Sequence, residues 1–146
     1  MPAAPQLPEE LHARVAVLSE RGDRLAEAGN YNAAAARYRE ALALLPAPPG
    51  RYGEALWLYG AIADAHFHQG DWEGCRENMQ RARDEARGTG NAFVELRLGQ
   101  AHFELKQLDA AEAHLFEAFR AGGEALFRNE APRYLFWLRE RVASED

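Results

Sequence analysis

Apolar residues recur at intervals of three and four along almost the whole chain, and Gly or Pro residues interrupt them. This spacing is typical of amphipathic α-helices, because residues three or four positions apart lie on one helix face. Strand-like alternation is absent, and β-branched residues, which favour strands, are few. The pattern predicts an all-α fold with helices over 8–28, 31–45, 51–69, 72–87, 91–105, 108–121 and from 131 into the 140s, with a short helical turn before the last.

Three segments, 29–46, 70–87 and 106–123, align with one another without a gap. They share an aromatic residue or leucine at the third position, a small residue at the sixth, a large apolar residue at the tenth and alanine at the thirteenth. These columns hold Tyr31, Trp72 and Leu108; Ala34, Cys75 and Ala111; Tyr38, Met79 and Leu115; and Ala41, Ala82 and Ala118. The preceding helices share a small residue at Gly22, Ala63 and Gly99. A repeated helix pair predicts stacking, because one pair alone cannot bury both of its faces.

The repeat resembles the tetratricopeptide repeat (TPR) family, whose helix–turn–helix motif spans about 34 residues. The first copy, about 15–48, carries the family's pattern at Gly22, Leu25, Ala34, Tyr38, Ala41 and Pro46; the others cover about 56–89 and 92–125. The resemblance implies a right-handed α-solenoid of three helix pairs. We expect a single domain over 8–146, with a capping helix at about 131–144 and a disordered lead-in at 1–7.

The resemblance also implies that the first helix of each pair lines a concave groove. The side chains expected there are Asp23, Glu27, Trp57, Asp64, Phe67, His68, Phe93, Arg97, Gln100, Phe103 and Glu104. A groove that combines aromatic and acidic side chains suits a protein or peptide partner that is apolar with basic residues. Aromatic residues at helical spacing are equally typical of packing between helices. The sequence therefore leaves open whether the groove is free or filled by the chain itself.

One subgroup of the family clamps the C-terminal carboxylate of chaperone peptides with two Lys, two Asn and one Arg. The matching positions here are Ser19, Asp23, Ala61, Phe93 and Arg97. Only Arg97 keeps the residue type, and the carboxylate of Asp23 would repel that of a peptide. We therefore expect no binding of chaperone tails.

The last predicted helix carries more large apolar residues than one core face requires. Its core stripe, within a sector of about 100°, consists of Tyr134, Leu135, Leu138 and Val142. Phe136 points nearly opposite to this stripe, and Trp137 lies to one side. With Phe127 they would form an exposed apolar patch, and such patches often mark interfaces. An alternative function is therefore homodimerisation through the C-terminal helix.

The segment 122–138 also resembles the ends of some small bacterial repeat proteins, in which an acidic-Pro-basic-Tyr motif opens the last helix. Here Ala131 occupies the acidic position before Pro132, Arg133 and Tyr134.

The composition argues against some classes of partner and indicates the cellular compartment. The net charge of −6 argues against general nucleic-acid binding, which needs a basic surface. Cys75 is the only cysteine, so no internal disulfide forms, as is usual in a reducing compartment. The first ten residues lack the charge and apolar core of a secretory signal, and no apolar run approaches the ~18 residues of a membrane span. We expect a cytoplasmic protein without a membrane partner.

Catalytic motifs are absent from the sequence: no phosphate loop, dinucleotide fingerprint or nucleophile elbow occurs. Asp64 and His68 share a helix face, and Glu104 is expected on the neighbouring helix, so a three-ligand metal site competes with an ordinary acid–histidine pair. The lack of a dense ligand motif favours the pair. We expect a non-enzymatic scaffold without metal or cofactor.

Overall fold

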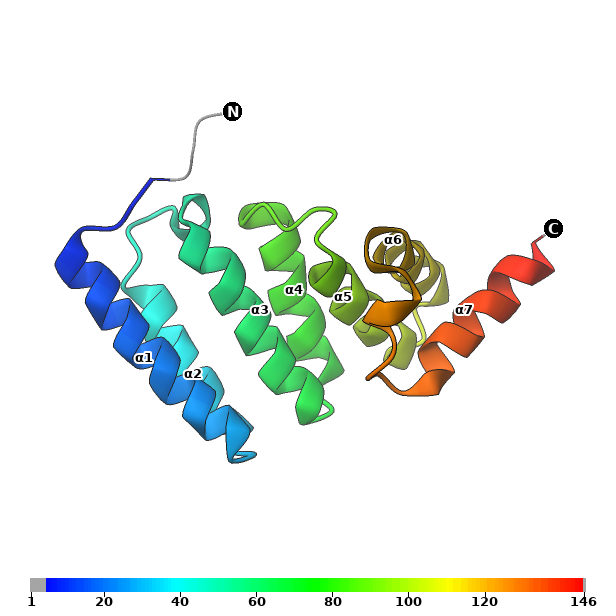
Figure 1. Ribbon diagram of the computed structural model, residues 1–146, viewed down its shortest axis with the longest axis horizontal. Helices are drawn as coiled ribbons and strands as arrows, with labels where there is room; N and C mark the ends of the chain where they lie inside the picture. The colour runs from blue at the N-terminus through cyan, green and yellow to red at the C-terminus, as the bar shows by residue number, and fades with distance from the viewer. Residues whose placement is uncertain (1–4, 146) are drawn as a thin grey trace.

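The computed structural model describes residues 5–145, and helices account for most of them (Figure 1). The elements are α1 (Glu9–Glu27), α2 (Tyr31–Ala43), the 3₁₀ turn η1 (Pro49–Arg51), α3 (Gly53–His68), α4 (Trp72–Glu85), α5 (Ala92–Glu104), α6 (Leu108–Leu126) and α7 (Pro132–Ser144). Residues 5–145 contain no strand. The all-α prediction is confirmed. The helix expected over 51–69 begins only at Gly53, because the preceding prolines form η1.

Glycines and capping side chains determine where several helices end and begin. Gly29 and Gly70 follow α1 and α3 with φ of 80° and 74°, a left-handed conformation that glycine adopts without steric cost. At the start of α4 the side chain of Asp71 accepts a hydrogen bond from the backbone N–H of Gly74. Asn91 caps α5 in the same way, at 3.1 Å from the N–H of Val94. Each cap satisfies a helix N–H that has no partner within the helix.

In the first and third pairs, the two helices cross closely at the small-residue column. A methyl group built on Gly99 would lie 2.7 Å from the side chain of Leu115, and one on Gly22 would overlap the ring of Tyr38. Both partners come from the large apolar column of the following helix. The shared pattern of the three segments therefore reflects contact between the helices of one pair.

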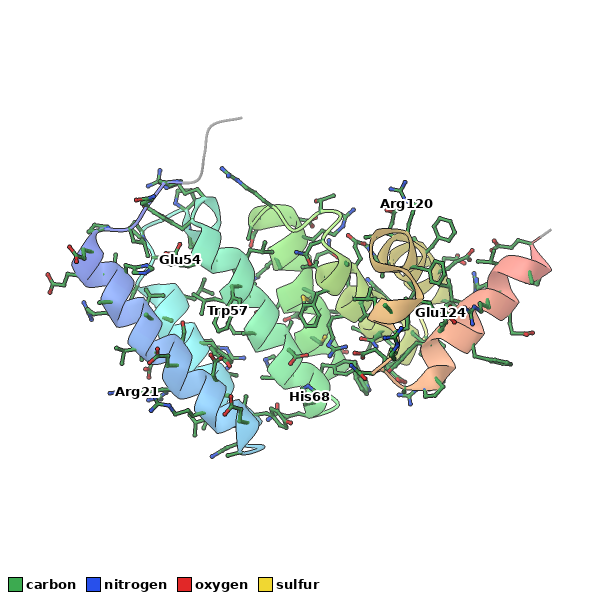
Figure 2. All side chains as sticks on the ribbon, in the orientation of Figure 1. Arg21, Glu54, Trp57, His68, Arg120 and Glu124 are labelled. Atoms are coloured by element: carbon green, nitrogen blue, oxygen red, sulfur yellow. The ribbon has the colours of Figure 1, made fainter. Side chains whose placement is uncertain are left out.

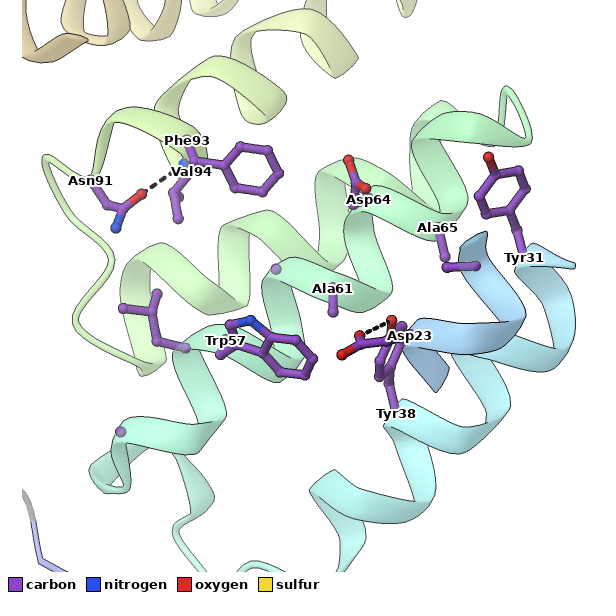
Figure 3. Close-up of a pocket in the computed structure, with 14 residues that line it drawn as sticks. Asp23, Tyr31, Tyr38, Trp57, Ala61, Asp64, Ala65, Asn91, Phe93 and Val94 are labelled. Atoms are coloured by element: carbon purple, nitrogen blue, oxygen red, sulfur yellow. Dashed lines mark hydrogen bonds between the residues drawn. The ribbon is translucent and has the colours of Figure 1, made fainter. Parts of the chain in front are cut away.

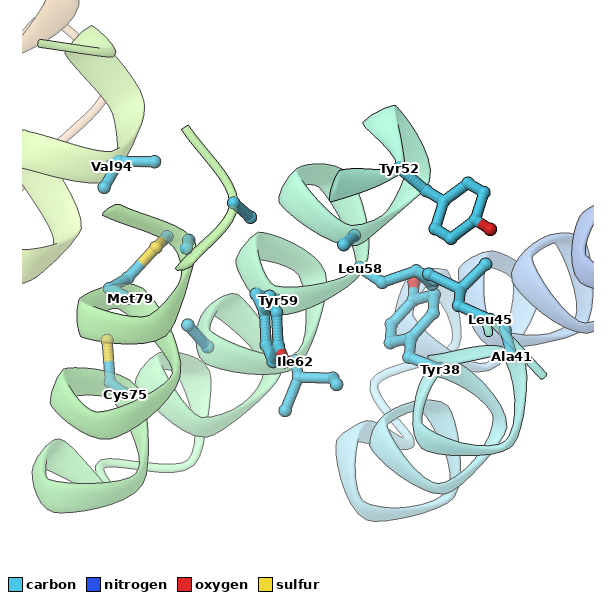
Figure 4. Packing of buried hydrophobic residues seen from close by; sticks show 14 of the residues in the cluster. Tyr38, Ala41, Leu45, Tyr52, Leu58, Tyr59, Ile62, Cys75, Met79 and Val94 are labelled. Atoms are coloured by element: carbon cyan, nitrogen blue, oxygen red, sulfur yellow. The ribbon is translucent and has the colours of Figure 1, made fainter. Parts of the chain in front are cut away.

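The core divides into two clusters. The first runs through the first two helix pairs into α5 and includes Tyr38, Leu58, Ile62 and Met79 (Figure 4). Leu7 belongs to it and is only 9% exposed. The disordered lead-in expected at 1–7 is therefore wrong at Leu7, which packs on the core; residues 1–4 lie outside the described residues.

The second cluster joins α5, α6 and α7 through Leu96, Leu115, Tyr134 and Leu138. Phe127 also belongs to it and is 5% exposed. The exposed position expected for Phe127 is therefore wrong. Within α6, Gly123 has non-helical angles (φ 67°, ψ −168°). The resulting kink redirects the end of α6, and the ring of Phe127 packs 6.3 Å from that of Phe119.

Each helix packs against the next along the chain, and α3 also contacts α5. Figure 1 shows the helices arrayed side by side from α1 to α6, with α7 at the far end. Tyr134 and Leu138 of α7 are buried against the last pair, which confirms the predicted stack of three helix pairs and its capping helix. None of the helices in residues 5–145 combines the length and apolar character needed to cross a membrane.

Candidate functional site

A pocket of about 470 Å³ lies among α1, α2, α3 and the start of α5 (Figure 3). We call it the open groove. Its lining consists of Asp23, Ala26, Tyr31, Tyr38, Gly53, Leu56, Trp57, Gly60, Ala61, Asp64, Ala65, Asn91, Phe93 and Val94. Most of these side chains are small or apolar. The structure thus brings together four of the predicted groove residues, Asp23, Trp57, Asp64 and Phe93.

Two large aromatic side chains stand partly free in the open groove. Trp57 is 48% exposed and Phe93 is 39% exposed. Figure 2 places Trp57 in the first half of α3, and its ring meets that of Tyr38 edge-on at 5.5 Å. This contact covers part of Trp57, and about half of the side chain remains exposed. Tyr38 is a groove residue that the sequence analysis assigned only to helix packing.

The charge of the open groove is negative. Asp23 and Asp64 are the only charged side chains among its described lining residues. The hydroxyl of Tyr38 donates to Oδ1 of Asp23 at 2.7 Å. Burial, reinforced by this hydrogen bond, raises the pKa of Tyr38, so its hydroxyl remains a donor to Asp23.

The groove of the third pair is occupied by the chain itself. Arg97 and Gln100 are 6% and 0% exposed. Arg97 donates through Nε to Asp64 at 2.8 Å and through Nη1 to Glu130 at 2.6 Å. Burial opposes the charge of Arg97, but Asp64 and Glu130 outweigh it and raise its pKa. Gln100 bridges the same groups, accepting from Arg97 and donating to Glu130, both at 2.8 Å.

The sequence pattern did not predict a role for Glu130. This residue follows α6 and has no place in the repeat pattern, so only the kink at Gly123 and the course of the chain after it bring it over α5. Phe67 belongs to the same network, because the guanidinium of Arg97 lies 4.1 Å from its ring centroid and 5.0 Å from that of Phe93. Such cation–aromatic contacts add to the ion pairs.

Phe103 and Glu104 are covered by α7. The ring of Phe103 lies 5.4 Å from Tyr134 and 5.1 Å from Trp137. Glu104 accepts from the hydroxyl of Tyr134 at 2.9 Å and from Arg133 at 2.8 Å. We call the surface formed by Arg97, Gln100, Phe103 and Glu104 the closed groove. The sequence left open whether the groove at these four residues is free; in the structure Glu130 and α7 fill it.

The two remaining predicted groove residues lie at the rim. Glu27 is exposed near the end of α1. The ring of His68 stacks on Tyr31 at 5.0 Å, and its Nε2 lies 3.3 Å from Oδ2 of Asp64. Because Glu104 is turned toward α7, it does not join this pair. Within residues 5–145, no three His, Cys, Asp or Glu side chains are grouped so as to hold a metal ion.

Of the residues considered for self-association, Phe127 and Phe136 line one hollow, whereas Trp137 packs on another part of the surface. Phe136 is 66% exposed on α7, as expected from its angle on the helix. Trp137 packs on Phe103 and lies 5.4 Å from the guanidinium of Arg141. A second hollow, of about 580 Å³, lies beside Phe136. It is lined by Glu124, Phe127, Arg128, Glu130, Pro132, Leu135, Phe136 and Arg139.

No family model and no curated protein matches this chain. Solved structures similar to it include the first TPR domain of Spaghetti (RPAP3) bound to the HSP90 peptide SRMEEVD and the first TPR domain of human RPAP3. The first has a TM-score of 0.68 and 19% identity, over 90% of this chain and 93% of the other. The second has a TM-score of 0.66 and 18% identity, over 89% and 91%. Together with the three stacked helix pairs and their capping helix, these likenesses establish that the chain has the fold of a TPR domain.

Proposed function

We propose that this chain is a non-catalytic scaffold that binds a peptide segment of a partner protein in the open groove. One observation carries the proposal: Trp57 and Phe93 stay 48% and 39% exposed inside a pocket of about 470 Å³. Large aromatic side chains held on rigid helices around a concave, mostly apolar surface are typical of binding sites. The Spaghetti (RPAP3) domain is similar in fold and holds an HSP90 peptide, which supports a peptide ligand here.

The partner segment is expected to be apolar with basic residues. The two charged side chains of the open groove are Asp23 and Asp64, so an acidic segment would be repelled. The HSP90 peptide SRMEEVD bound by the Spaghetti domain is rich in acidic residues. Arg97, the one residue here that matches the carboxylate clamp, already pairs with Asp64 and Glu130. We therefore propose a partner of different chemistry from that peptide.

A random-peptide display selection on the wild-type chain tests this function, and it does not require the partner to be identified first. Trp57→Ala should weaken the selected peptides by about tenfold or more, as loss of a central aromatic anchor does. Phe116→Ala is the matched control, because Phe116 is 47% exposed on α6 and does not line the open groove. Both variants should keep the wild-type far-ultraviolet circular dichroism. A selection without enriched peptides, or equal binding by both variants, would contradict the proposal.

Homodimerisation through α7 is a second candidate function. It is favoured by Phe136, which is 66% exposed beside the hollow between α6 and α7. Light scattering after size exclusion decides the matter: a wild-type monomer at high micromolar concentration removes this candidate. If the chain is a dimer, Phe136→Glu should convert it to a monomer, because the introduced charge would be buried at the interface.

A further inference from the structure

We propose that the open groove contains a specific site for one arginine side chain of the partner segment, with its guanidinium against the rings of Trp57 and Phe93 and paired with Asp23. This inference rests on the proposed function, since it names the side chain that anchors the bound segment. It follows from three features of the groove: its unpaired charge, its aromatic surfaces, and the way the chain already holds one of its own arginines next to it.

The first feature is the charge. Oδ1 of Asp23 accepts from Tyr38, while Oδ2 has no hydrogen bond or ion pair to any described residue. Asp64 is shared between Arg97 and His68. With no basic side chain among the described lining residues, the carboxylate of Asp23 remains free to pair with a cation. A cationic ligand therefore complements this pocket, and an anionic one does not.

The second feature is the aromatic surface around Asp23. Figure 3 shows Trp57, Phe93, Asp23 and Asp64 around one opening. A cation over an aromatic face is attracted to the ring, most strongly for Trp. The half-exposed rings of Trp57 and Phe93 and the carboxylate of Asp23 thus provide both the stacking and the ion-pairing surfaces that a cationic side chain needs.

The third feature is Arg97 of the closed groove, whose guanidinium contacts Asp64 and Phe93 of the open groove. Its guanidinium is within 4.1 Å of the ring centroid of Phe67 and 5.0 Å of that of Phe93, and its Nε donates to Asp64 at 2.8 Å. The chain thus already binds one guanidinium with aromatic rings and an aspartate. The open groove offers the same combination of groups. Trp57 would provide the aromatic ring, as Phe67 does for Arg97, and Asp23 would provide the carboxylate, as Asp64 does.

Arginine fits this surface better than lysine does. A guanidinium is planar, stacks on aromatic faces, presents paired donors to a carboxylate and is more weakly hydrated than an ammonium group. Because most of the lining is apolar, the cation must lose water on entry, and the weaker hydration of arginine lowers that cost.

The test uses a small probe, N-acetyl-arginine N-methylamide, and follows the indole N–H signal of Trp57 by NMR, assigned with Trp57→Phe. The signal should shift in a saturable manner with the arginine probe. It should shift much less with the corresponding citrulline compound, which keeps the shape without the charge, and less with the lysine compound. An equal response to citrulline, or none to arginine, would overturn the site; an equal response to lysine would overturn the preference for a guanidinium.

Asp23→Asn should weaken the arginine probe by about two- to fivefold, as loss of an exposed ion pair does, while asparagine still accepts from Tyr38. Glu20→Gln is the matched control, since Glu20 lies on α1, pairs with Arg24 at 3.8 Å and does not line the groove. Equal weakening in both variants would overturn pairing with Asp23.

The experiments distinguish a failure of the arginine site from a failure of the proposed scaffold function. Groove-dependent peptides that bind equally well after their arginines are replaced by citrulline would overturn the arginine site and leave the scaffold function standing. A selection that yields no groove-dependent peptide would count against the scaffold function, whereas a saturable, citrulline-discriminating shift at Trp57 would still support the arginine site.

Discussion

Arg97 of α5 and Glu130, which follows α6, form an ion pair with Nη1 2.6 Å from Oε1, although 33 residues separate them in the chain. Both side chains are largely buried, with exposures of 8% and 15%. Together with α7, this pair fills the closed groove with the chain's own side chains.

Glu130→Ala should destabilise the fold strongly. The substitution leaves the buried guanidinium of Arg97 with Asp64 as its remaining carboxylate and leaves Gln100 without an acceptor. We expect the free energy of unfolding to fall by about 3 kcal/mol, the usual cost of breaking a buried pair. Urea denaturation measures the loss. Arg139→Ala is the control, because the Arg139–Glu124 pair is exposed and its removal should change stability by less than ~1 kcal/mol.

Gly99→Ala should lower stability by about 1–3 kcal/mol, because the added methyl group has no room beside Leu115. Gly60→Ala provides the matched comparison within a helix. A methyl group there meets nothing within 4 Å, and replacing a helical glycine should raise stability by about 0.5–1 kcal/mol. Thermal unfolding of both variants checks the opposite signs; two changes of the same sign would refute the close crossing at Gly99.

Phe103→Ala should act on stability rather than on ligand binding. Phe103 packs on Tyr134 and Trp137 beneath α7. Because Phe103 is only partly buried, we expect a loss of about 2 kcal/mol, below the ~3–5 kcal/mol of a fully buried Phe. The emission of Trp137 should shift to longer wavelength as its cover is removed. Phe116→Ala, on the exposed side of α6, should leave both quantities near wild type.

Cys75 should be unreactive until the chain unfolds. Burial raises the pKa of its thiol to about 12 from an ordinary 9.0, and only the thiolate attacks labelling reagents. The folded state therefore favours the neutral thiol. Its contribution to stability is present below pH ~9 and is lost as the pH rises toward 12, because the unfolded chain ionises first. The rate at which Cys75 reacts with Ellman's reagent at pH 8, with and without urea, measures how far folding protects the thiol. Cys75→Ala should reduce the alkaline loss of stability.

The repeat pattern was sufficient to predict the three helix pairs and the capping helix, because contacts such as Gly99 with Leu115 and Gly22 with Tyr38 recur at fixed spacing. It also placed Asp23, Trp57, Asp64 and Phe93 in one groove. It failed where a contact depends on the path of the chain after the last repeat. The kink at Gly123 buries Phe127 and brings Glu130 to Arg97. Neither contact could be predicted from the repeat, because both lie after its last copy.

If the proposed function holds, the occupation of the closed groove by Glu130 and α7 leaves the molecule with one binding groove. The open groove spans only α1, α2, α3 and the start of α5, so under the proposed function one chain has room for one short segment. Tight binding would then require several linked contacts. Either the partner would carry several copies of the segment, or a dimer of this chain would present two grooves, because linking weak contacts raises their effective concentration.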